Sequence, residues 1–150
     1  MGDRTVVTLT IRTSQVAEAR PCFDTEPEYE HQDENGFTEF TFYEVNYGNL
    51  EFLDQLQEAG IAYDSRWESG SEFGPGCDYC RFTHDGEVIL KGVSDDYINP
   101  SIDALMRKIH DYTALKQLIL NHYNEISVPG WDFQEEYGKI YRTKQLIAPT

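Results

Sequence analysis

The segment IAYDSRWESGSEFGPGCDYCRFTHDGEVILKGV, residues Ile61 to Val93, carries the clearest hairpin pattern of the chain. Ile61 to Trp67 reads as a strand, and a loop rich in glycine and serine follows it. Tyr79 to Thr83 and Glu87 to Val93 are two further strand-like runs, joined by a turn that contains Asp85-Gly86, a pair that favours positive φ. We therefore predict three consecutive strands, the last two paired as a hairpin.

Two more strands and one helix are predicted on the N-terminal side of this segment. Arg4 to Arg12 alternates with period two and is rich in β-branched residues, and Phe37 to Tyr47 is a long aromatic and β-branched run. Asn49 is placed as an N-cap and Gly60 as a left-handed C′ residue, with leucines at helical spacing between them. The acidic segment from residue 23 to residue 36 is predicted to be an exposed loop.

The longest predicted helix starts at Asn99-Pro100 and stops before Pro129-Gly130. Apolar residues recur in it at intervals of three and four, at Ile102, Leu105, Met106, Ile109, Tyr112, Leu115, Leu118, Ile119 and Ile126. The pattern fits one amphipathic helix or two with a joint near Thr113, and its apolar face is expected to cover a sheet. The tail from Trp131 to Thr150 fits either a strand or a helix.

The order of these elements predicts an α+β fold. We expect a mostly antiparallel sheet of about five strands with two helices, one of them long, packed on one face. At 150 residues the chain is most simply a single globular domain, with residues 131–150 as a docked or a flexible tail.

Charge is distributed unevenly along the chain. The formal net charge is −15, and the segment from Glu18 to Asp96 holds twenty acidic and only four basic side chains. Tyr97 to Thr150 holds six of each sign. A negative field repels nucleic acid and anionic membranes and attracts basic partners. We therefore expect direct binding neither to nucleic acid nor to a membrane. The alternative is that the acidity serves only solubility.

The sequence also bounds the compartment. Three cysteines form no disulfide framework, and no apolar run approaches the ~18 residues of a membrane span. The N-terminus shows no charged and apolar regions of a secretory signal. We expect a cytoplasmic protein with reduced thiols.

Cysteine spacing suggests a weak metal site. Cys77, Cys80 and His84 have a spacing compatible with zinc, and Cys22 could complete a tetrahedron. A second ligand pair is missing, however, and the predicted strand would hold Cys80 and His84 roughly 13 Å apart. We therefore expect no metal and no other cofactor, with a small zinc-stabilised protein as a minor alternative.

Catalytic motifs are absent from the sequence. It contains no nucleophile elbow, P-loop, zinc-protease helix or Gly-rich dinucleotide turn. We expect that the protein is not an enzyme.

The remaining hypothesis is interaction with another protein. Carboxylates held in fixed places, interleaved with aromatic side chains, can mimic nucleic-acid phosphates and occupy a basic groove. In size and charge the chain resembles small phage- or plasmid-encoded anti-defence inhibitors, although no motif is shared. The predicted binding residues are Asp24, Glu26, Glu28, Glu30, Glu51, Asp54, Glu58, Asp64, Trp67, Glu68 and Glu72.

The predicted partner is a basic, nucleic-acid-binding protein. The alternative is a non-catalytic adaptor or assembly subunit that uses the long amphipathic helix, for example as a homodimer.

Overall fold

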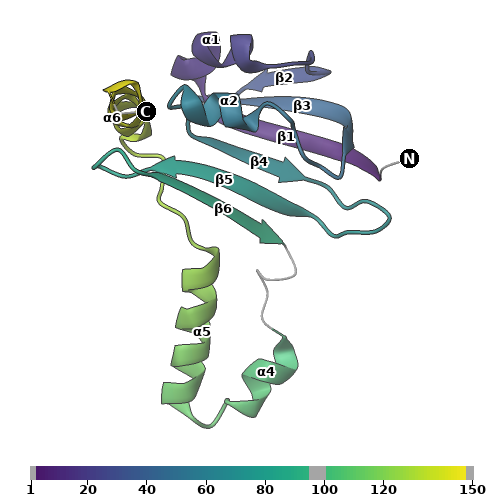
Figure 1. The fold of residues 1–150 in the computed structure, drawn as a ribbon. Helices are drawn as coiled ribbons and strands as arrows, with labels where there is room; N and C mark the ends of the chain where they lie inside the picture. Colours follow the sequence, from purple (N-terminus) through teal and green to yellow (C-terminus); the bar gives the residue numbers. More distant parts are fainter. Residues whose placement is uncertain (1–2, 95–100, 148–150) are drawn as a thin grey trace.

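A computed structural model describes residues 3–94 and 101–147 of the chain. Its strands form one sheet in the order β2-β3-β1-β4-β5-β6, and every neighbouring pair is antiparallel (Figure 1). The bounds are β1 Arg4–Arg12, β2 Tyr29–Gln32, β3 Phe37–Asn46, β4 Tyr63–Trp67, β5 Gly76–Phe82 and β6 Val88–Ser94. The predicted α+β class is confirmed, with six strands rather than five.

The additional strand is β2, which lies in the segment predicted to be a loop. It pairs with β3 from Tyr29 opposite Thr41 to Gln32 opposite Thr38, and all four of its residues are exposed. Asp33 closes the turn between the two strands, because its carboxylate accepts the backbone N–H of Phe37 at 2.9 Å. An exposed edge strand buries no side chain, so it leaves no apolar alternation in the sequence.

One face of the sheet carries the core and three helices. These are α1 Val16–Ala19, α2 Leu53–Glu58 and α6 Gln134–Ile147 (Figure 1). Val7, Leu9 and Ile11 of the central strand β1 are fully buried beneath them. Gly60 ends α2 as predicted: its φ is +75°, its N–H bonds to Gln57 O, and the N–H of Ile61 bonds to Leu56 O. This pattern is a Schellman cap, which only glycine adopts without strain.

The predicted long helix is two helices, α4 Ile102–Arg107 and α5 Tyr112–Ile126. Asp111 breaks the run because its carboxylate caps α5 by accepting the N–H of Ala114 at 3.1 Å. The break therefore lies close to the alternative joint near Thr113. The predicted start at Asn99-Pro100 falls outside the described residues.

The expectation that this helical region covers the sheet is wrong. No residue of α4 or α5 is buried, and the pair projects away from the sheet (Figure 1). The core face of the sheet is already occupied by α1, α2 and α6. None of the helices that the structure describes is long and apolar enough to cross a membrane.

Residues 134–147 of the tail, for which the sequence fits either a strand or a helix, form the helix α6, which docks on the sheet. The side-chain amide of Gln134 accepts the N–H of Phe82 at 2.7 Å and donates to its carbonyl at 3.0 Å. Tyr141 packs on the Phe82 ring with the centroids 5.0 Å apart. The connection from α5 passes Arg81, whose guanidinium lies 4.0 Å from the Trp131 ring centroid. The described part of the tail therefore packs against β5 through α6.

Candidate protein-binding surface

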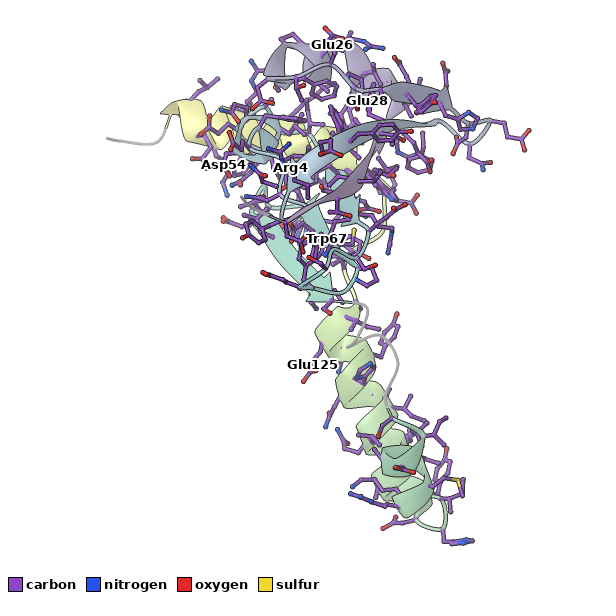
Figure 2. All side chains as sticks on the ribbon, turned by 90° about the vertical axis from the view of Figure 1, so that its right-hand side faces the viewer. Arg4, Glu26, Glu28, Asp54, Trp67 and Glu125 are labelled. Carbon is purple, nitrogen blue, oxygen red and sulfur yellow. The ribbon has the colours of Figure 1, made fainter. Side chains whose placement is uncertain are left out.

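Seven exposed carboxylates gather along α2 and the loops beside it. We call this set the acid ridge: Asp24, Glu26, Glu28, Glu44, Glu51, Asp54 and Glu58. The first three lie in the segment between η2 (Arg20–Cys22) and β2, Glu44 lies in β3, and Glu51 lies in the turn before α2. Figure 2 places Glu26, Glu28 and Asp54 on the part of the body farthest from α4 and α5.

Three neighbouring depressions connect the members of the acid ridge. The first, of about 220 Å³, is lined by the five carboxylates from Asp24 to Glu51. Glu51 and Asp54 line the second, of about 310 Å³, together with Asp78 of β5. Asp54 and Glu58 line the third, of about 580 Å³, which lies between α2 and α6. Because Glu51 and Asp54 are each shared by two depressions, the ridge is one continuous surface.

Glu44 is the member of the ridge that the sequence did not single out. In strict alternation it would share the buried face of Phe40 and Phe42. The pairing of β1 with β3 slips by one residue between Thr5 and Val7, and Glu44 has a φ of +57°. This β-bulge turns the Glu44 side chain outward, where 75% of it is exposed.

The carboxylates of the ridge are mostly without ion pairs, although Lys91 and Arg142 line the second and the third depression. Within the described residues the single ion pair of the ridge joins Arg4 Nη1 to Glu44 Oε2 at 3.5 Å, and both side chains are more than half exposed. Glu28 Oε2 accepts the backbone N–H of Tyr43 at 2.9 Å, which holds its carboxylate against the end of β3. An exposed pair such as Arg4–Glu44 binds weakly, so an incoming cation can displace Arg4.

Several predicted binding residues lie outside the ridge. Glu30 pairs with Arg20, and Asp64 lies 2.7 Å from the guanidinium of Arg81 with only 22% of its side chain exposed. Trp67 packs against Gly48 and donates its indole N–H to Gly74 O at 3.0 Å. Glu68 and Glu72 are exposed in the loop between β4 and β5, and line none of the three depressions.

Burial of Asp64 has an electrostatic consequence. Desolvation raises the pKa of its carboxyl, although the neighbouring Arg81 acts in the opposite direction. Asp64 therefore belongs to the packing of the sheet, not to the charged surface.

The weak zinc candidates do not come together. Cys77 and Cys80 are three residues apart on β5, so their side chains point to opposite faces of the sheet. His84 lies exposed at the hairpin turn, 3.1 Å from the Asp85 carboxylate, and Cys22 lies on η2. In residues 3–94 and 101–147, no group of three or more His, Cys, Asp or Glu side chains could hold a metal ion.

Burial raises the pKa of Cys77 and of Cys80 to about 12 each. We predict that both thiols react with a thiol reagent at pH 8 roughly a thousandfold more slowly than an exposed cysteine, because the thiolate is the reactive form. Cys22 is half-buried and is expected to react first. Spectrophotometric titration of the native protein should show one fast thiol, which Cys22→Ser removes. Two or more fast thiols would contradict this.

The chain was compared with protein-family models, with curated proteins and with solved structures, and none of them matches it.

Proposed function

We propose that this protein is a small acidic inhibitor, or decoy, that binds the basic surface of a nucleic-acid-binding protein in the cytoplasm. The observation that supports this most directly is the acid ridge, in which six of the seven carboxylates are without an ion pair among the described residues. A groove that binds phosphates carries Lys and Arg side chains, and a fixed row of carboxylates is complementary to it. Such a decoy carries out no reaction.

Secondary structure or a backbone hydrogen bond holds four of the seven ridge carboxylates in fixed places, namely Glu28, Glu44, Asp54 and Glu58. Asp54 and Glu58 are four residues apart on α2, which is anchored by the buried Leu53 and Leu56. Glu44 and Glu28 are held by the end of β3. Preorganised charges lose little conformational entropy on binding, so more of the electrostatic attraction remains as affinity. The long-range field of the ridge would also accelerate encounter with a basic partner.

The test is a pull-down from a nuclease-treated bacterial lysate with three immobilised proteins. They are the wild type, a ridge variant with Glu51→Lys, Asp54→Lys and Glu58→Lys, and a control with Glu34→Lys, Asp132→Lys and Glu136→Lys. The two variants change the net charge equally, and the control residues are exposed and lie outside the ridge. We expect the wild type and the control to retain a nucleic-acid-binding protein that the ridge variant does not retain.

The retained protein is then purified and tested for competition with a fluorescent DNA or RNA duplex. We expect the wild type to displace the duplex. Its affinity for the retained protein is expected to fall about tenfold or more between low and physiological salt. Equal retention by the ridge variant, or retention without competition, would refute the decoy function.

A further inference from the structure

The two helices that leave the sheet form a separate projection, which we call the helical arm, residues 101–126. Figures 1 and 2 both show it extending from the β6 side of the body, with Glu125 near its attached end. Lys91 of β6 fixes that end, because its ammonium group donates to Asn124 O at 3.1 Å and to Ser127 O at 2.9 Å. None of the side chains in α4 or α5 is buried.

The α5 helix carries an apolar stripe with a symmetric spacing. Tyr112, Leu115, Ile119, Tyr123 and Ile126 fall within about 80° of the helix circumference at 3.6 residues per turn. Counted from Ile119, the others lie four and seven residues away in each direction. Tyr112, Ile119 and Tyr123 are 76%, 49% and 61% exposed. The positions of the stripe, although not their residue types, therefore coincide when the helix is reversed about Ile119.

The exposed apolar surface of the arm approaches the size of one side of a standard interface. Besides Tyr112, Ile119 and Tyr123 it includes four more exposed side chains, Ile102, Met106, Ile109 and Leu120. At about 200 Å² for a tyrosine and ~120 Å² for an aliphatic side chain, these seven expose on the order of 600 Å². A standard interface buries about 800 Å² on each partner. In addition, helices as short as α4 and α5 depend on packing against another element for their stability.

Charge favours a second copy of the chain as the partner. Residues 101–126 contain three acidic and three basic side chains, whereas the whole chain has a net charge of −15. An arm can therefore approach an identical arm without net repulsion. In an antiparallel arrangement, the two acidic bodies lie at opposite ends of α5, which is about 22 Å long at 1.5 Å per residue. That length exceeds the Debye length of about 8 Å at physiological salt, so repulsion between the bodies is largely screened.

We propose that the arm is a homodimerisation element, in which α5 packs antiparallel against α5 of a second copy about a two-fold axis at Ile119. This pairing sets Tyr112 opposite Ile126 of the other copy and Leu115 opposite Tyr123. The flanking α4 helices complete a four-helix arrangement. The dimer is independent of the acid ridge and leaves it exposed on both bodies.

Sedimentation equilibrium of the full chain tests the dimer. The wild type is expected to be dimeric at tens of micromolar, with no loss of dimer as salt rises. Ile119→Lys places two ammonium groups at the axis and is expected to raise the dimer Kd by ~100-fold or more. Tyr123→Ser is a second variant, and circular dichroism checks the fold of both. The control is Leu146→Lys, because Leu146 is an exposed apolar residue on α6, with 78% of it exposed against 49% of Ile119.

Disulfide trapping in a Cys22→Ser background tests the orientation. A mixture of the Tyr112→Cys and Ile126→Cys proteins is expected to cross-link, whereas Tyr112→Cys alone is not. A wild type that is monomeric, an Ile119→Lys protein that stays dimeric, or self-cross-linking of Tyr112→Cys would each overturn the proposal. The ridge variant is expected to dimerise normally, so failure of the decoy function and failure of the dimer are distinguishable.

Discussion

Replacing Arg81 by methionine is expected to lower the free energy of unfolding by about 3–5 kcal/mol, since it removes one partner of a buried ion pair. Arg81 is 2% exposed, and its guanidinium donates to the carbonyl oxygens of Tyr63, Cys80 and Pro129 at 2.9–3.1 Å. Its Nη2 lies 2.7 Å from Asp64 Oδ1. The methionine would fill the volume, but it would leave the carbonyls and the Asp64 carboxylate without their cation.

The loss of unfolding free energy in Arg81→Met is expected to be smaller at pH 4 than at pH 7. Burial raises the pKa of Asp64 even with Arg81 present, and loss of Arg81 raises that pKa further. A carboxyl whose pKa is higher in the folded state stabilises the fold most below its unfolded pKa of about 3.9, and this contribution is lost as the pH rises. Urea denaturation of wild type and variant at pH 4 and pH 7 measures the difference.

A double variant provides the control for the Arg81 prediction. Adding Asp64→Leu removes the orphaned carboxylate and is expected to recover part of the stability at pH 7. A deficit that is equal at the two pH values, or a double variant no more stable than Arg81→Met, would show that packing rather than charge is lost.

Strand alternation predicted most of the fold, because a half-buried strand must place apolar side chains at every second position. The bounds of β1 were predicted without error, and the predicted Asp85-Gly86 turn is present, with Gly86 at a φ of +76°. Amphipathicity of the helical region was also real, yet it states only that an apolar face exists. The pattern does not show what covers that face, and in the structure the sheet does not cover it.

The acid ridge was only partly predictable for a similar reason. Exposure of Asp54 and Glu58 follows from helix periodicity, whereas Glu51 lies in the turn before α2, and the continuity of the ridge with Asp24 and Glu26 depends on tertiary packing. The pairing of Asp64 with Arg81 depends on the register between β4 and β5, which single-sequence patterns do not fix. The exposure of Glu44 depends on a β-bulge, and no residue pattern in β3 predicts that bulge.

Gly138→Ala is expected to undock α6 and to cost about 3 kcal/mol of unfolding free energy, because overpacking against the backbone cannot relax by a side-chain rotation. An ideal Cβ at Gly138 would overlap the carbonyl oxygen of Gly60 and lie 2.9 Å from its carbonyl carbon. Gly60 cannot move easily, since its φ of +75° closes α2. A shift of α6 would separate Tyr141 from Phe82 and break the two hydrogen bonds of Gln134.

Urea denaturation measures the loss in Gly138→Ala, and limited proteolysis shows whether cleavage begins within α6, as undocking requires. Gly130→Ala is the matched control, because a Cβ there meets no atom within 4 Å. It is expected to leave stability within about 0.5 kcal/mol of the wild type. If Gly138→Ala were as stable as this control, the close approach of α6 to the Gly60 cap would not hold the helix in place. The docking would then rest on the other contacts of α6, which include those of Tyr141, Gln134 and Lys144.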